Sequence, residues 1–301
     1  MENKKKADNV TRRKIVAILA VFFCLVTAAF AVWYLKGTHD QTPVDIENAL
    51  TITNLQAGKA DAAVICFKDV TSMVDTGLEE DYELIDEWLK SHDRTKIDFM
   101  ILTHFDRDHI GSAVKILQNY PVAAVYYPDY VSTKEYYAPL MEELAVPREG
   151  RKAVAVDEKM SFDIDEVKIE LFPADDPEEI FETGNKVDNN MSLMSMISFG
   201  SKKFLFTGDV EKERLSQLVE SSDDHSADWM TFPHHGAYEK HEKDFISKVA
   251  PRYGVISTGY EREPDEKLTE YLDKKKISFL TTLDGNVTTI CDGKSLTMSM
   301  Q

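Results

Sequence analysis

The sequence predicts one α/β (α+β) domain with both strand and helix layers, preceded by an apolar N-terminal segment. From about Leu50 onward, short apolar runs typical of strands alternate with segments whose apolar residues recur at helical spacing. The residues after Leu50 contain no internal repeat, low-complexity tract or interior linker. A separate run from Ile15 to Leu35 contains no charged residue. We therefore expect residues 50–301 to form a single domain.

The expected elements alternate along the chain. Leu84, Ile85, Trp88 and Leu89 recur at helical spacing, which predicts the first helix of the domain. The expected helices are 79–92, 111–120, 137–146, 210–221 and 265–276. Strand and hairpin patterns are bounded by turn residues such as Gly200. The expected strands and hairpins are 50–56, 61–67, 71–77, 97–103, 123–128, 162–173, 192–209, 228–233, 253–259, 278–283 and 286–291.

The N-terminal segment predicts a membrane anchor. Residues 1–14 carry six basic and two acidic side chains, and the uncharged run that follows would span about 31 Å as a helix, enough to cross a bilayer. The early lysines and arginines predict a cytoplasmic N-terminus. We expect a single-pass cell-membrane protein with an anchor at 15–35 in the lipid bilayer, a linker at 36–49 and an extracellular domain at 50–301. The alternative is a secreted protein, cleaved near Ala31 after the motif "AFA".

Histidine and aspartate side chains gather just after predicted strands. The stretch "ILTHFDRDHIGSA" follows one strand, an aspartate follows a hairpin, and a histidine pair follows a third strand. The candidates are His104, Asp106, Asp108, His109, Asp209, His234 and His235. Loops at strand ends bring side chains together on a rigid scaffold. Because imidazole and carboxylate ligands suit zinc, manganese or iron, and a bridging carboxylate suits a pair of ions, we expect a metal site.

Several motifs resemble those of a known superfamily. "MVDTG", "LTHFDRDHIG", "FLFTGD" and "FPHHG", in this order and spacing, resemble the metallo-β-lactamase fold superfamily. "LQAGKADAAVI" and "NNMSL" resemble its ComEC-like and phosphorylcholine-esterase-like branch. The resemblance covers about Leu50 to the C-terminus. It implies an αββα sandwich, in which two mixed β-sheets are flanked by helices.

The resemblance also implies two divalent metal ions, zinc or manganese, that share Asp209. The first ion would be bound by His104, Asp106 and Asp209. The second would be bound by Asp108, His109, Asp209 and one histidine of the "HHG" pair. The loop is usually H-x-H-x-D-H in the superfamily and is H-x-D-x-D-H here, a change that the ComEC-like branch shares. Because the first site is then poor in nitrogen ligands, manganese is favoured there.

The "HHG" pair offers two candidates for one ligand position. Adjacent residues at a strand end point to opposite sides, so we expect only one histidine to face the metals. The resemblance favours His235 as the ligand. His234 would then donate a hydrogen bond to the substrate or hold a metal ligand in position.

Three further polar residues have expected roles near the metals. Asp108 is expected to steer the attacking water in addition to binding metal. The resemblance places Asp75 behind the metal-binding loop, where it would orient histidines. Asn190, with Ser192 nearby, either orients Asp209 or the substrate, or simply begins a hairpin, and the residues leave this open.

The remaining cysteines and histidines have simpler interpretations. Cys66 and Cys291 lie in strand-like runs and are expected to be buried thiols, although a disulfide between them stays open. His225 and His241 lie among polar residues and are expected to be solvated.

The expected function is hydrolysis of a phosphodiester, small or nucleic acid, by a metal-bridging hydroxide. Residues 36–301 carry 29 basic and 51 acidic side chains, a net charge of −22, which argues against bulk nucleic acid as the substrate. A β-lactamase is also disfavoured, since those enzymes normally hold three histidines at the first metal. The alternative is a catalytically inactive surface binding module of the same fold. The residues indicate no protein partner.

Overall fold

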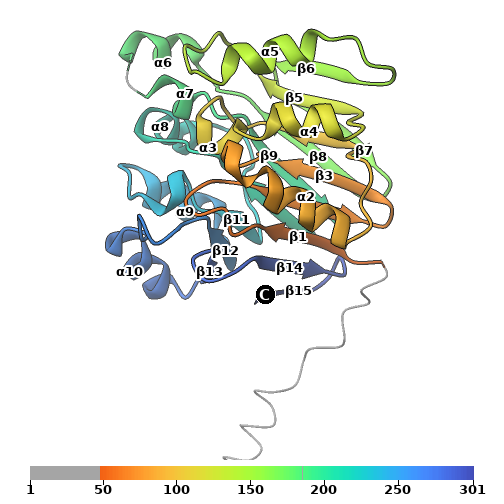
Figure 1. Cartoon of the computed structure of the whole chain (residues 1–301). Coiled ribbons are helices and arrows are strands. Elements are labelled where there is room, and N and C mark those ends of the chain that lie inside the picture. The colour runs from red at the N-terminus through yellow and green to blue at the C-terminus, as the bar shows by residue number, and fades with distance from the viewer. Residues whose placement is uncertain (1–47, 185) are drawn as a thin grey trace, which may run out of the picture. The chain divides into compact units, whose positions relative to one another are not determined.

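The computed structural model describes residues 48–184 and 186–301, and their strands form two sheets (Figure 1). Within these ranges one sheet has eight strands in the order β15-β14-β1-β2-β3-β4-β5-β6, and the other has seven in the order β13-β12-β11-β10-β9-β8-β7. The strands are β1 (Leu50–Asn54), β2 (Ala63–Phe67), β3 (Val70–Val74), β4 (Phe99–Ile101), β5 (Ala124–Pro128), β6 (Lys152–Val156), β7 (Met160–Ile164), β8 (Val167–Phe172), β9 (Met194–Phe199), β10 (Lys202–Phe206), β11 (Trp229–Thr231), β12 (Tyr253–Ile256), β13 (Ser278–Thr281), β14 (Val287–Cys291) and β15 (Leu296–Met300). The helices are η2 (Glu79–Asp81), α2 (Tyr82–Ser91), α3 (Arg107–Ile110), α4 (Ala113–Asn119), α5 (Tyr137–Ala145), α6 (Pro177–Thr183), α7 (Val187–Asn190), α8 (Lys212–Glu220), η3 (His234–Gly236), α9 (Glu242–Val249) and α10 (Glu266–Lys275).

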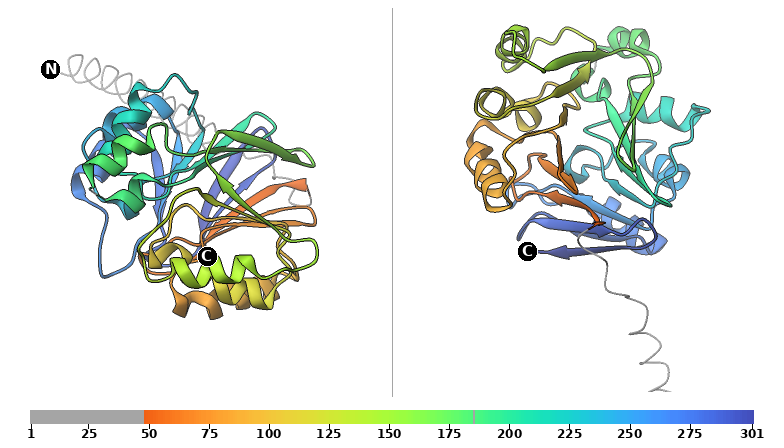
Figure 2. Two further views of the ribbon diagram at one scale, coloured as in Figure 1. Left: turned by 90° about the horizontal axis from the view of Figure 1, so that it is seen from above. Right: turned by 90° about the vertical axis from the view of Figure 1, so that its right-hand side faces the viewer.

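The two sheets pack face to face between two layers of helices, as the right-hand view of Figure 2 shows. Successive strand residues point to opposite faces, so each sheet contributes to two layers of core. In β2, Ile65 packs in the core between the sheets, whereas Val64 packs in the core that contains residues of α2, α4 and α5. In β10, Phe204 lies between the sheets and Leu205 lies in the core shared with α8, α9 and α10. This arrangement confirms the expected αββα sandwich of two mixed sheets.

The parallel parts of the two sheets determine where the candidate residues lie. Strands β3 to β6 run parallel in the first sheet, and β10 to β13 run parallel in the second. Parallel strands end at the same edge of a sheet, where polar side chains can converge. The polar residues identified in the sequence follow the carboxyl ends of β3, β4, β10 and β11. The fold therefore gathers them at one edge.

Several elements were not expected from the sequence, among them the short helical turns α7 (Val187–Asn190) and η3 (His234–Gly236). Strand β6 has mostly exposed or half-buried residues and therefore lacks clear alternation. Strand β15 pairs only with β14 at the edge of its sheet, and α6 and α9 are short helices. The loop after β4 also contains one helical turn, α3, within the H-x-D-x-D-H stretch.

The alternative of a Cys66–Cys291 disulfide is excluded by strand order. Both cysteines are free and buried. Thr51 of β1 pairs with Cys66 on one side, and Leu50 pairs with Cys291 on the other. The two cysteines therefore lie two strand spacings apart, about 9–10 Å. A disulfide requires Cα atoms no more than about 7 Å apart, so the expected buried thiols are confirmed.

The predicted localisation, a cell-membrane protein with an extracellular domain, is corrected by the structure. Across 48–184 and 186–301, no helix is long and apolar enough to cross a membrane. The longest helices of these ranges, α2 and α10, have 10 residues each, whereas a span needs about 20. The predicted span, 15–35, and its cytoplasmic segment, 1–14, lie outside the described residues, as does most of the linker, 36–49.

Two hairpin turns, one from each sheet, touch at Gly200 and Gly293. Ser201 N donates to the Gly293 carbonyl (2.7 Å), and a Cβ on Gly200 would overlap that carbonyl oxygen. Because Gly200 also has a φ of +58°, we predict that Gly200→Ala lowers the free energy of unfolding by about 2–3 kcal/mol, measured by chemical denaturation. The control is Gly150→Ala, where φ is +80° but the added Cβ meets nothing within 4 Å. Equal losses in the two variants would contradict the proposed close contact.

Candidate metal centre

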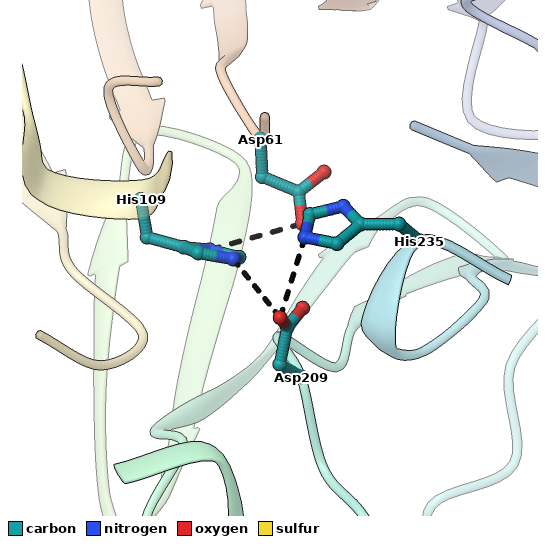
Figure 3. Close-up of side chains that lie close together, drawn as sticks. All are labelled: Asp61, His109, Asp209 and His235. Carbon is teal, nitrogen blue, oxygen red and sulfur yellow. Dashed lines mark ion pairs between the residues drawn. The ribbon is translucent and has the colours of Figure 1, made fainter. Parts of the chain in front are cut away.

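The centre of the site is the carboxylate of Asp209, which three imidazoles face. Its Oδ2 atom lies 3.3 Å from Nε2 of His109, 3.3 Å from Nε2 of His235 and 4.0 Å from Nε2 of His104. All four side chains are buried. Figure 3 shows Asp209 between the two nearer imidazoles.

The backbone before Asp209 is shaped to bring it there. Gly208 has a φ of +57°, and a Cβ at this position would lie 2.9 Å from both Ser192 Oγ and Thr103 Cβ. Only glycine fits this turn without displacing neighbours. Asp209 N donates to Ser192 Oγ at 3.2 Å. Ser192 therefore holds the backbone of Asp209, one of the roles that the sequence left open.

Asp61 joins the cluster and was not selected from the sequence. The ligand atoms of Asp61, His109, Asp209 and His235 all lie within 4.8 Å of one another (Figure 3). Asp61 Oδ2 is 3.8 Å from His109 Nδ1, and Asp61 N donates to the Asp108 carbonyl at 3.0 Å. Asp61 precedes a strand, whereas the expected ligands all follow strands. Its signal was the motif "LQAGKADAAVI", which contains it.

Asp75 contacts two residues of the loop after β4, Thr103 and His109. Its Oδ2 is 2.8 Å from His109 Nδ1 and accepts from Thr103 Oγ1 at 2.7 Å, while its Oδ1 accepts from Thr103 N at 2.8 Å. A carboxylate on Nδ1 fixes the imidazole so that Nε2 points toward Asp209. Asp75 itself has a φ of +58°, which turns its side chain under the loop.

The structure places Asp106 and Asp108 next to lysines. Asp106 precedes the first residue of α3, and its Oδ1 lies 2.6 Å from Lys134 Nζ. Asp108 Oδ2 lies 2.7 Å from Lys59 Nζ and 3.6 Å from His235 Nε2. Asp108 therefore adjoins the group around Asp209, while the roles of both aspartates as ligands stay predictions.

The "HHG" pair forms a tight turn and not the end of a strand. His234 and His235 both have left-handed backbones, with φ of +50° and +57°, inside the 3-10 turn η3. His235 faces Asp209, whereas His234 Nδ1 lies 3.2 Å from Glu211 Oε1. The expectation that the two rings point apart agrees with this geometry, but the cause is the turn. The roles of ligand and substrate contact stay predictions.

Asn190 and His225 lie in surroundings that the sequence did not show. Asn190 Oδ1 accepts from Glu211 N (3.1 Å) and Arg214 N (3.0 Å), so it caps the start of α8. His225, expected to be solvated, is 1% exposed and packs 5.1 Å from the Phe172 ring. Burial, followed by the Arg214 charge, lowers the pKa of His225 to about 4.

Burial and mutual charges determine the protonation of the site. Burial and neighbouring His109 lower the pKa of His104 to about 3. Burial also acts to lower the pKa of His109 and of His235, but the neighbouring carboxylates raise both pKa values by more. Asp209 and Asp75 raise the pKa of His109 well above its usual value, and Asp209 and Asp108 raise the pKa of His235 to about 9. Although burial opposes it, the charges of His235 and His109 hold the Asp209 pKa well below its usual range.

The donor set fits divalent metal ions. His104 Nε2 and Asp209 Oδ1 are buried atoms without a hydrogen-bond partner in the described part of the chain. Buried polar atoms normally have such partners, so these atoms point to an additional ligand. Imidazole nitrogens and carboxylate oxygens suit zinc and manganese.

Metal binding should become stronger with rising pH. A ligand imidazole must be unprotonated, and the carboxylates near His235 raise its pKa to about 9. Below that pH a proton must leave before metal binds, so the apparent affinity should fall by about tenfold per pH unit for each proton released. Competition with a chelator between pH 6 and 9 measures this. An affinity independent of pH would contradict the assignment.

The two histidines of the pair should differ in their effect on metal content. His235→Ala removes an imidazole 3.3 Å from Asp209 Oδ2 and should lower metal content, with partial recovery in excess metal. His234→Ala should retain the metal, because His234 faces Glu211. The measurement is metal per chain by mass spectrometry, with the exposed His92→Ala as the control. Loss of metal from His234→Ala and not from His235→Ala would reverse the two roles.

Comparisons with known proteins identify the family and the fold of this chain. Residues 56–260 match the family described as the metallo-beta-lactamase superfamily. "ComE operon protein 3" of Bacillus subtilis (strain 168) is 28% identical over 190 residues, which are 62% of this chain and 24% of that protein. The chain thus matches about a quarter of that relative's length, and this similarity supports the ComEC-like part of the expected branch.

Two solved structures share the fold. A mutant of the CmlA beta-hydroxylase has a TM-score of 0.56 at 13% identity, covering 83% of this chain and 54% of that chain. Igni18, described as a metallo hydrolase from the archaeon Ignicoccus hospitalis KIN4/I, has a TM-score of 0.51 at 15% identity, covering 80% and 98%. At such identities the likeness concerns the fold alone. The family match over residues 56–260 shows that this chain belongs to the metallo-beta-lactamase superfamily, whose members include metal-dependent hydrolases.

Proposed function

We propose that this protein is a binuclear metal-dependent phosphodiesterase. The observation that carries the proposal is Asp209 Oδ2, which faces Nε2 of three imidazoles at 3.3, 3.3 and 4.0 Å. A carboxylate shared in this way can lie between two cations. Two divalent ions bound there would supply a water-derived nucleophile near neutral pH and positive charge for the phosphate oxygens.

The chain's own residues would orient the ligands and the water. Asp75 holds His109 through Nδ1 and is in turn held by Thr103. Asp108 Oδ2 lies 3.6 Å from His235 Nε2, and in this scheme Asp108 would accept a hydrogen bond from the water and orient it. No side chain need act as a covalent nucleophile in this scheme.

A small phosphodiester is the favoured substrate class. The net charge of −22 on residues 36–301 repels long polyanions, while a single phosphodiester carries only one negative charge. A β-lactam is disfavoured, because Asp106 occupies the position at which β-lactamases have a second histidine.

Hydrolysis of bis(p-nitrophenyl) phosphate by the purified protein tests the proposal. We expect turnover that is lost with a chelator and restored by added zinc or manganese, and little turnover of a chromogenic β-lactam. Asp209→Asn keeps the shape of the side chain but removes its charge, so the rate should fall by more than about 100-fold. The exposed His92→Ala should keep the full rate. Metal binding without turnover of any diester would instead favour a binding module.

A further inference from the structure

Two lysines from different loops reach the candidate metal ligands. Lys59 lies between β1 and β2, and Lys134 lies between β5 and α5. Their Nζ atoms are 2.7 Å from Asp108 Oδ2 and 2.6 Å from Asp106 Oδ1. Both side chains are about two-fifths exposed, so each spans from the candidate centre to solvent.

The loops hold the backbones of both lysines in place. In the first loop, Ala60 N donates to the Ala57 carbonyl at 3.1 Å, and a Cβ on Gly259 would lie 2.9 Å from Gly58 Cα. In the second, Lys134 N donates to Ser132 Oγ at 3.1 Å, and the Ser132 hydroxyl donates to Asp188. Only the flexible side chains are therefore free to change partner.

Metal binding would change the electrostatics of both lysines. Two divalent ions on Asp106, Asp108 and Asp209 would neutralise the carboxylates that now attract the ammonium groups. Each lysine would then be a cation beside other cations, a position that a bound anion stabilises. The domain is strongly acidic, so a pair of lysines at this edge is a local exception that could attract an anion.

We propose that Lys59 and Lys134 form a clamp that binds the phosphate group of the substrate beside the metal centre. The proposal rests on the proposed phosphodiesterase function. Each ammonium group donates to a non-bridging phosphate oxygen, which neutralises the charge of the diester and sets its position. The clamp would thus favour an anionic ester over a neutral one.

The test uses the metal-loaded protein and inorganic phosphate as the probe. Lys59→Met and Lys134→Met keep an unbranched apolar chain but remove the charge. Isothermal titration should show phosphate affinity lower by about 10-fold in each variant, as for the loss of a charge-assisted hydrogen bond, and metal per chain should match the wild type. Lys59→Arg and Lys134→Arg should retain most of the affinity. The matched control is Lys96→Met, since Lys96 pairs with Asp98 at 2.7 Å just before the amino end of β4.

The phosphate affinities, the metal contents and the diester hydrolysis rates together separate the clamp from the proposed function. Unchanged phosphate affinity in both methionine variants would overturn the clamp, as would loss of metal from either, because the lysines would then act on the metal ligands. Diester hydrolysis by the wild type together with unchanged phosphate affinity and KM in the variants would overturn the clamp and leave the proposed function intact. Phosphate binding that depends on the lysines, in a protein that hydrolyses no diester, would support the clamp and reject the function.

Discussion

The structure of the site depends on burying the Asp209 carboxylate among imidazoles. A buried charge is strongly disfavoured unless an opposite charge accompanies it. His109 and His235, each 3.3 Å away, can supply that charge, because the carboxylates around them raise the pKa of both imidazoles. Divalent ions could supply it in their place. The imidazoles that stabilise the buried Asp209 carboxylate are therefore also positioned to bind a cation together with it.

The rest of the fold holds Asp209 and the imidazoles at fixed distances from one another. The parallel strands of both sheets end at one edge, and the core between the sheets, with Trp229 and Phe204 fully buried, fixes their separation. Tight turns then direct the side chains. Gly208 turns the chain so that Asp209 points inward, and the left-handed backbones of His234 and His235 separate the two rings. Such precision requires packed elements beneath the loops, because a loop alone would sample many geometries.

In the proposed function, local charge would allow an acidic protein to bind an anionic substrate. An overall negative charge disfavours long polyanions, while Lys59 and Lys134 pair with Asp108 and Asp106, the two aspartates predicted to bind metal. The positive charge offered to a substrate would therefore depend on metal loading. The aspartates pair with the lysines in this structure, and metal bound to those aspartates would leave the lysines available to an anion.

The sequence by itself determined the residue types of the site, the strands that precede them and the family to which they belong. These features are local, because ligand chemistry lies in side-chain type and strands show in short apolar patterns. Edge strand β6, with mostly exposed side chains, carried too little pattern to be predicted. Only the tertiary structure decided that Asp61 joins His109, that His235 faces Asp209, and that His225 is buried. These three facts depend on distances between residues that are far apart in the chain. The packing of the two sheets and the left-handed turns set those distances, and no local sequence pattern contains them.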